Sequence, residues 1–118
     1  MNKPLEREVT GIPGTFLMKR ELTIVVPAFN EAKAIGQTMA ALKDMLATAG
    51  IDGEIVVVDD GSADGTGDAA EAAGVRVIRL PENSGYGFAL KTGIAESDSK
   101  FVAIIDADGT YPAGKIPD

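Results

Sequence analysis

The 118-residue sequence contains no cysteine and no histidine. Without cysteine the chain can form no disulfide, no thiolate zinc site and no cysteine nucleophile. Without histidine it has no Ser–His–Asp triad, no histidine metal site and no imidazole base. Any catalysis must therefore depend on carboxylates, lysine, hydroxyls, backbone N–H groups and a bound cation. Because carboxylate and carbonyl oxygens select hard cations, Mg²⁺ or Mn²⁺ is the metal that we expect.

Basic residues are also scarce, since 11 Lys and Arg stand against 18 Asp and Glu, for a formal net charge of −7. Duplex DNA is bound chiefly by neutralising its phosphates, so this balance argues against a nucleic-acid partner. No apolar run approaches the roughly 18 residues that cross a bilayer, and the start lacks the apolar stretch of a signal peptide. The expected location is therefore the cytoplasm.

Residues 1–20 differ from the rest of the chain, because they hold two prolines and two glycines and show no sustained hydrophobic period. We predict a flexible, loosely ordered extension here, with an ordered N-terminal arm as the alternative. Met18 stands just before the first predicted strand, so either Met1 or Met18 can be the start of the protein. Residues 21–118 then form one domain, whose size is that of an ordinary single domain.

From residue 22 onward, short apolar runs alternate with helical stretches. Strands are predicted over residues 22–26, 54–59, 75–80 and 101–105, and the first, second and fourth are predicted to be buried. The first helix has Asn30 as its N-cap and ends at Gly50. Its apolar stripe consists of Ile35, Met39, Leu42 and Leu46. Helices are also predicted over residues 66–73 and from about 87 to 96, so the pattern predicts an α/β fold with a parallel sheet covered on both faces.

Each predicted strand is followed by polar or turn residues, over 27–31, 59–64, 81–87 and 106–110. In open α/β sheets, ligands bind at this carboxyl edge. Loops favour Asp and Gly for conformational reasons, so any single segment can be a simple turn. The better indication of a site is the presence of four aspartates at two of these strand ends, Asp59, Asp60, Asp106 and Asp108.

Asp106 and Asp108 lie two positions apart directly after the fourth strand. On an extended backbone their carboxylates project to the same side and offer oxygen ligands to a divalent cation, which also relieves their mutual repulsion. A calcium EF-hand loop does not fit, because the sixth residue counted from Asp106 is Tyr111 and the twelfth is Pro117. A solvated turn is the alternative to a metal site.

The other strand ends offer groups suited to a nucleotide. Asp60 can accept hydrogen bonds from a base or ribose, or it can belong to a turn that caps the next helix. Gly85 precedes a helix, where exposed N–H groups suit a phosphate, and Lys91 could reach an anion. Neither the P-loop nor the dinucleotide-binding pattern is present there. Phe29 offers a flat apolar face after the first strand, although a plain strand-to-helix turn also explains that segment.

Taken in order, four segments resemble the nucleotide-sugar-binding half of glycosyltransferase family 2. They are VPAFNE at 26–31, VVDDGSADGT at 57–66, NSGYGFALKTGI at 83–94 and DADGTYP at 106–112. The last two are most similar to the dolichol-phosphate mannosyltransferase and polyprenyl-phosphate glycosyltransferase branch. The resemblance covers about residues 22–118. It implies a GT-A fold, a Rossmann-like and mostly parallel sheet that binds a nucleotide-diphosphate sugar with Mg²⁺ or Mn²⁺.

The resemblance also implies roles for individual residues. The nucleoside pocket would be lined by Pro27, Phe29 and Glu31, of which Phe29 stands where family members often have tyrosine. Val58 and Asp60 would contact the base or its surroundings. Asp106 and Ala107 would meet the nucleotide, and Asp108 would hold the metal that bridges the diphosphate, with Asp106 and Thr110 as further metal-side groups. Gly85 and Lys91 remain candidates for the phosphate side.

The implied function is a metal-dependent, inverting glycosyltransferase with a donor of the GDP-mannose or UDP-glucose type. For this branch the acceptor would be a polyprenyl or dolichyl phosphate, with the longer protein associated with the membrane. The family's acceptor half follows the fourth strand, so we expect the chain to be truncated after about four strands and to be inactive alone, with its catalytic residues unknown. Two alternatives stay open, a nucleotide-binding module without catalysis and a nucleotidyltransferase like the nucleotide-sugar pyrophosphorylases. A receiver-type phosphorylation module fits less well, because it needs its acidic pair after the first strand.

Overall fold

The chain is built around one parallel sheet, seen in a computed structural model that describes residues 6–8, 16–18 and 20–108. The strands of this sheet pair in the order β5-β4-β3-β6, and every neighbouring pair is parallel. Their bounds are β3 (Leu22–Ala28), β4 (Gly53–Asp59), β5 (Arg76–Arg79) and β6 (Phe101–Ile104). The predicted parallel α/β sheet is therefore confirmed.

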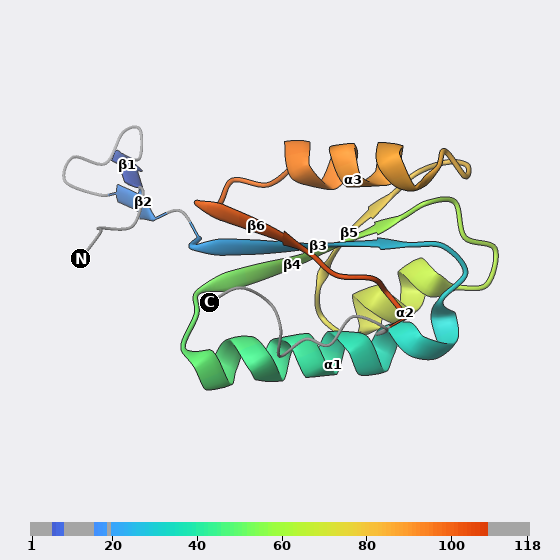
Figure 1. Cartoon of the computed structure of the whole chain (residues 1–118), viewed down its shortest axis with the longest axis horizontal. Helices are drawn as coiled ribbons and strands as arrows, with labels where there is room; N and C mark the ends of the chain where they lie inside the picture. Colours follow the sequence, from blue (N-terminus) through green and yellow to red (C-terminus); the bar gives the residue numbers. More distant parts are fainter. Residues whose placement is uncertain (1–5, 9–15, 19, 109–118) are drawn as a thin grey trace.

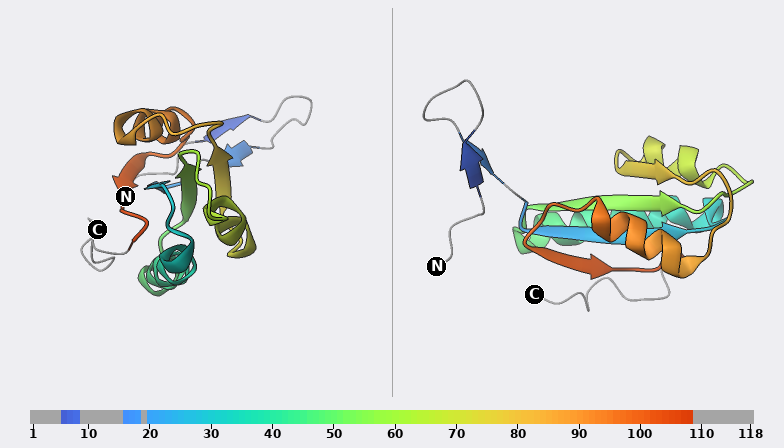
Figure 2. Two further views of the ribbon diagram at one scale, coloured as in Figure 1. Left: turned by 90° about the vertical axis from the view of Figure 1, so that its right-hand side faces the viewer. Right: turned by 90° about the horizontal axis from the view of Figure 1, so that it is seen from above.

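Helices cover both faces of the sheet, as the sequence predicts. Their bounds are α1 (Ala32–Ala49), α2 (Thr66–Ala72) and α3 (Tyr86–Ala95). Helices α1 and α2 lie on one face and α3 lies on the other (Figure 1). The end-on view in Figure 2 shows the three layers. Gly50 ends α1 in the left-handed conformation, with φ of 68°, which glycine adopts without a steric penalty.

The side chains on the two faces of β3 and β4 belong to two separate hydrophobic cores. On the α1 side the predicted stripe of α1 packs against alternate residues of β3 and β4 such as Ile24 and Val57. On the α3 side the core is smaller and contains Val25, Val56, Val58 and Ala89. All seven residues of β3 are buried, as expected for a strand with a neighbour on each side and a helix on each face.

Helix α3 packs closely on β3 at Gly93. A Cβ placed on Gly93 would stand 2.4 Å from Cγ1 of Val25, so only glycine fits where α3 crosses β3. The first turn of α3 lies at the carboxyl edge of the sheet because α3 follows the loop after β5.

Strand β6 departs from the prediction that residues 101–105 are fully buried. Phe101 is 57% exposed, and Val102 and Ile104 are each 39% exposed, while Ile105 just beyond the strand is buried. The reason is position: β6 lies at the edge of the sheet, and α3 packs on β3 and β4. An apolar run predicts a strand, but the neighbours of that strand decide its burial.

The described part of the N-terminal segment consists of two short strands. Strands β1 (Glu6–Glu8) and β2 (Phe16–Met18) pair antiparallel, with Glu6 opposite Met18. The other residues up to 19 lie outside the described part of the chain, so the loosely ordered extension stays a prediction. Over the residues that the structure describes, no helix has the length and apolarity needed to cross a bilayer.

Candidate functional site at the carboxyl edge of the sheet

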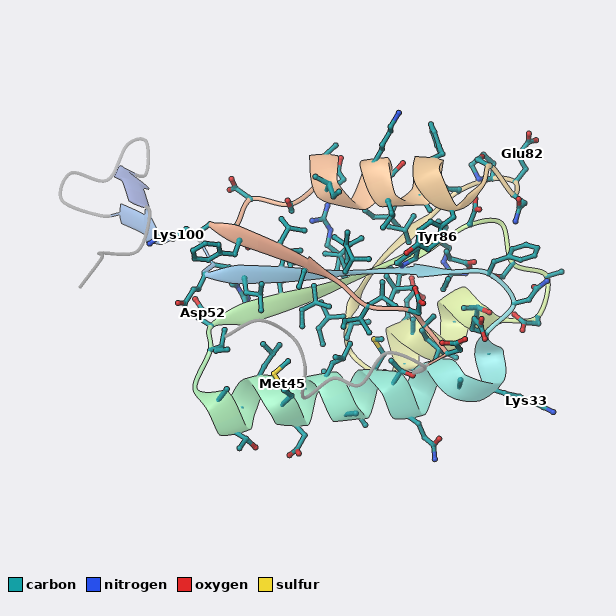
Figure 3. All side chains as sticks on the ribbon, in the orientation of Figure 1. Lys33, Met45, Asp52, Glu82, Tyr86 and Lys100 are labelled. Atoms are coloured by element: carbon teal, nitrogen blue, oxygen red, sulfur yellow. The ribbon has the colours of Figure 1, made fainter. Side chains whose placement is uncertain are left out.

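A cleft of about 390 Å³ opens at the carboxyl ends of β3 and β6, beside the first turn of α3. The residues that line it come from three strand-to-helix loops and from the segment after β6. They are Pro27, Ala28, Phe29, Glu31, Asp60, Asn83, Gly85, Tyr86, Ala89, Asp106, Ala107 and Asp108. Figure 3 shows Tyr86 and Glu82 at this end of the sheet, and Asp52 and Lys100 at the opposite end.

Eight of the eleven residues that the sequence places in the site line this cleft. They are Pro27, Phe29, Glu31, Asp60, Gly85, Asp106, Ala107 and Asp108. Val58 does not line it, because its side chain is fully buried beneath α3. Lys91 is exposed on α3 and also lies away from the cleft lining. Thr110 falls outside the described residues.

The loop between β3 and α1 forms one wall. Phe29 is 46% exposed there, so its ring offers an apolar face to a planar ligand. Asn30 is not the N-cap that the sequence predicts. Its backbone is left-handed, with φ of 53°, and Oδ1 of its side chain accepts the N–H of Ala63 at 2.9 Å. Glu31 stands at the cap position and makes no side-chain capping bond.

Side chains of the β4–α2 loop and of Thr66, the first residue of α2, supply the missing cap from outside the helix. Three successive N–H groups, those of residues 30–32, donate to Ser62 Oγ at 2.8 Å, Thr66 Oγ1 at 2.9 Å and Asp64 Oδ2 at 3.1 Å. The N–H groups at the start of α1 thus have protein side chains as acceptors and need no ligand.

Asp60 is buried, at 4% exposure, and its carboxylate anchors the loop before α3. Oδ1 accepts the N–H of Ser84 at 2.7 Å, and Oδ2 accepts the N–H of Gly85 at 2.9 Å. The N–H of Gly85, which the sequence predicts on the phosphate side, therefore already donates to a carboxylate. The carboxylate of Asp60 nevertheless lines the cleft, and its oxygens retain further acceptor positions.

Tyr86 connects the first turn of α3 with the segment after β6, because its hydroxyl donates to Oδ1 of Asp106 across 3.4 Å. Partial burial raises the pKa of Tyr86 above its usual value, and the negative charge of Asp106 raises it further. Sequence reasoning did not single out Tyr86 or Asn83. Both stand in the NSGYG segment that carries the family resemblance, and that segment was the available signal.

The Asp106–Asp108 segment is held in place by β3 and α1. Ile105 donates its N–H to the Val25 carbonyl of β3 at 3.1 Å, and the buried Thr38 hydroxyl of α1 donates to the Ala107 carbonyl at 2.9 Å. Ala107 and Asp108 lie in a turn rather than on an extended backbone, yet Asp106 and Asp108 both line the cleft. This corrects the geometry that the sequence suggested and retains the paired acidic groups.

The charge of the cleft is one-sided. Four acidic side chains line it, Glu31, Asp60, Asp106 and Asp108, and within the described part of the chain no lysine or arginine does. Residues 20–108 contain no cluster of three acidic side chains placed as metal ligands. Two carboxylates nevertheless suit Mg²⁺, which proteins commonly hold with one or two carboxylates together with substrate phosphates and water.

An open parallel sheet with an acidic cleft at its carboxyl edge places the chain in the class of α/β proteins whose ligand sites lie at the strand ends. The chain belongs to glycosyl transferase family 2, because the model of that family matches residues 23–118. It is 45% identical over 98 residues to an uncharacterized protein of Methanocaldococcus jannaschii. The aligned region covers 79% of this chain and 37% of that relative.

Two further relatives carry functional names. An undecaprenyl-phosphate 4-deoxy-4-formamido-L-arabinose transferase of Klebsiella pneumoniae is 29% identical, over 87% of this chain and 33% of its own length. A glucosyl-3-phosphoglycerate synthase of Mycobacterium tuberculosis, solved with Mn²⁺, UDP-glucose and phosphoglyceric acid, superimposes with a TM-score of 0.64 at 30% identity. It covers 75% of this chain and 33% of the solved one. The GT-A fold is thereby confirmed, and the chain spans about a third of the length of these relatives.

Proposed function

We propose that this chain supplies the donor and metal site of a glycosyltransferase that uses a nucleotide-diphosphate sugar. The observation that carries the proposal is the acidic cleft, which brings together an exposed aromatic ring and four carboxylates with no described basic residue. A diphosphate would be repelled by such a cleft unless a divalent cation stood between the two sets of negative charges. The M. tuberculosis neighbour, which was solved with Mn²⁺ and UDP-glucose, supports this assignment.

The roles of the residues follow from where they lie. Phe29 would stack on the base, and Glu31 and Asp60 would accept hydrogen bonds from the nucleoside. Asp106 and Asp108 would hold Mg²⁺ or Mn²⁺, with Thr110 as a further predicted ligand. When bound, this ion neutralises the charge that grows on the departing diphosphate. Thr38 and the backbone of Ala107 fix the segment that carries both aspartates.

The proposed reaction is a displacement at the anomeric carbon of the sugar. An oxygen of the acceptor forms the new bond while the bond to the nucleoside diphosphate breaks, and the electron pair leaves with the diphosphate. Direct displacement inverts the configuration at that carbon. A phosphate acceptor is already an anion, so it needs positioning more than deprotonation.

We further propose a polyprenyl phosphate as the acceptor, at the membrane surface. The Klebsiella relative, which is named for undecaprenyl phosphate, supports this choice at 29% identity. The M. tuberculosis neighbour was solved with phosphoglyceric acid instead, so the feature common to both names is a phosphorylated partner. We place the longer protein at the cytoplasmic side of a membrane.

The test is thermal unfolding of this chain by calorimetry with UDP or GDP, each with and without Mn²⁺. A ligand that binds only the folded state raises stability by about 2.7 kcal/mol at a hundredfold excess over its dissociation constant. We expect a shift that requires Mn²⁺ and is lost in Asp108→Asn. Asp52→Asn is the matched control, since it makes the same charge change at the far end of the sheet, where Asp52 pairs with Arg20.

The nucleotide that gives the larger shift identifies the base of the donor. A shift that is equal with and without Mn²⁺ would contradict the metal site. No shift with either nucleotide would contradict the donor-site assignment.

A further inference from the structure

We propose that Asp64 is a positioning residue for the nucleotide, acting through the loop between β3 and α1. Asp64 is not among the residues that line the cleft, so it would act without touching the ligand. Its role is to hold residues 30–32 so that Phe29 and Glu31 face the cleft. The inference rests on the proposed function, because positioning matters only if a nucleotide occupies that cleft.

The carboxylate of Asp64 connects two chain segments that are far apart in sequence. Oδ2 accepts the N–H of Ala32 at 3.1 Å, at the first residue of α1. Oδ1 accepts both the N–H of Thr66, at 3.1 Å, and the Thr66 hydroxyl. Each carboxylate oxygen therefore has a donor, and the two donating segments lie on different helices.

The Thr66 hydroxyl extends this connection to the cleft. It donates its hydrogen to Asp64 and accepts the N–H of Glu31 at 2.9 Å. A hydroxyl has one hydrogen, so committing it to Asp64 leaves a lone pair directed at Glu31. Thr66 is fully buried, which keeps water from replacing this bond. An ionised Asp64 thus orients the Thr66 hydroxyl, which in turn holds the N–H of Glu31.

The backbone conformation of the β3–α1 loop explains why the loop needs hydrogen bonds from Asp64 and Thr66. Asn30 has a left-handed backbone, which a residue other than glycine adopts at a cost in free energy. Without external bonds the loop would relax toward other conformations. The two cleft residues stand on either side of Asn30, so a change at its φ angle would move both of them.

The three aspartates between Asp59 and Thr66 have different hydrogen-bond partners. In the segment from Asp59 to Thr66, Asp59 accepts the N–H of Ser62 at 3.0 Å and Asp60 anchors the loop before α3. Of these three carboxylates, that of Asp64 is the one that accepts an N–H of α1, from Ala32. The three carboxylates therefore hold three different segments.

The test combines amide hydrogen exchange with nucleotide titration, on the 118-residue chain. In Asp64→Asn the amide NH₂ replaces one acceptor oxygen, so it faces an N–H donor and breaks the arrangement. We expect faster exchange at residues 30–32 while the amides of β3 and β4 keep their protection. Affinity for UDP or GDP with Mn²⁺ should fall about tenfold, the size expected for one lost hydrogen bond to a charged group.

Matched variants separate positioning from general destabilisation. Asp68→Asn makes the same change in α2 at a side chain that is 81% exposed and paired with Arg79, and it should leave both measurements at wild-type values. Thr66→Val should expose the Glu31 N–H to exchange and weaken nucleotide binding. Thr66→Ser keeps the hydroxyl and should restore both the protection of the Glu31 N–H and the nucleotide affinity. Recovery in Thr66→Ser therefore shows that the loss in Thr66→Val comes from the missing hydroxyl.

Two results overturn the proposal: unchanged exchange at residues 30–32 in Asp64→Asn, or faster exchange there with wild-type nucleotide affinity. If the wild-type chain binds neither nucleotide, the proposed function fails, and positioning of a nucleotide fails with it. The exchange result then still reports whether Asp64 holds the loop, so the two failures are distinguishable.

Discussion

Asp60 and Asp64 stand four positions apart in the same loop and perform similar tasks in different surroundings. Each accepts backbone N–H groups near the start of a neighbouring helix: Asp60 holds Ser84 and Gly85 before α3, and Asp64 holds Ala32 at the start of α1. Asp60 is buried, whereas Asp64 is exposed. The comparison separates what a hydrogen bond contributes to stability from what it contributes to shape.

Solvent makes the difference between the two aspartates. When a buried carboxylate is removed, its donors lose their partner and the fold loses stability. When an exposed carboxylate is removed, water can satisfy the donors, so the net cost in stability is small. Water does not restore the particular loop conformation, however. Asp60 should therefore matter chiefly for stability, and Asp64 chiefly for the arrangement of the cleft.

The largest expected effect is that of Asp60→Ala. We expect it to lower the free energy of unfolding by about 3 kcal/mol, because two backbone donors lose a charged acceptor. Urea denaturation measures this loss directly. Asp68→Ala, in which the removed side chain is exposed, should change stability by less than about 0.5 kcal/mol. Equal effects of the two substitutions would refute the assigned role of Asp60.

The next effect concerns Gly61, which docks beside Asp60 on the same loop. Its φ is 76°, and a Cβ there would lie 2.4 Å from the carbonyl carbon of Glu82. Gly61→Ala should therefore cost about 2 kcal/mol, from backbone strain and from displacement of the loop before α3. Gly36→Ala is the control, since Gly36 is helical with nothing within 4 Å of its Cβ position, and it should stabilise α1 by up to about 1 kcal/mol. A neutral Gly61→Ala would show that this loop contact is dispensable.

The smallest effect is a dependence on pH at Asp64. The hydrogen bond from the Thr66 side chain is the main cause that lowers the pKa of Asp64 below its usual 3.8, and the backbone N–H groups of Ala32 and Thr66 add to it. A pKa lowered by folding means that the carboxylate form favours the folded state. Its contribution is present above the unfolded pKa and is lost as the pH falls through the folded value.

We therefore expect wild type and Asp64→Asn to differ in amide exchange at Ala32 near neutral pH and to converge once the pH falls below the lowered pKa of folded Asp64. The convergence follows because a protonated aspartic acid and an asparagine are both neutral and similar in shape. Exchange measured from neutral pH down to the pH at which Asp64 is protonated in the folded chain checks this, after correction for the intrinsic pH dependence of exchange. A difference that persists unchanged at the lowest pH would contradict the role of the charge.

The central part of the fold was predictable from the sequence because its signals are redundant. Strands β3 and β4 are continuous apolar runs, and the stripe from Ile35 to Leu46 predicts which side of α1 is buried. Burial of β6 was predicted wrongly because its run, from Phe101 to Ile105, resembles that of a central strand. Edge position depends on which strands pair and on where α3 packs, and no local pattern encodes either.

The location of the site was predictable, but the contacts within it were not. Polar residues after the strands place the cleft correctly, because parallel strands bring their carboxyl ends together. The N–H donors of Ser84 to Asp60 and of Ala32 to Asp64 lie 24 and 32 positions away, beyond the reach of a motif. The burial of the Val58 side chain under α3 could not be predicted, because a position within a motif does not reveal which face of the strand its side chain occupies. Asn30 failed as a cap because a tertiary contact with Ala63 took its side chain.

The order of the strands has a consequence for how the molecule is made. Strand β3 is the first of the main sheet along the chain, yet its outer neighbour β6 is the last. A bond between the hydroxyls of Thr23 and Ser99 closes a separation of 76 residues. Contacts of such long range slow folding, because the chain between them must be ordered first. During synthesis, β3 can pair with β4 early, but its other edge stays open until β6 has left the ribosome.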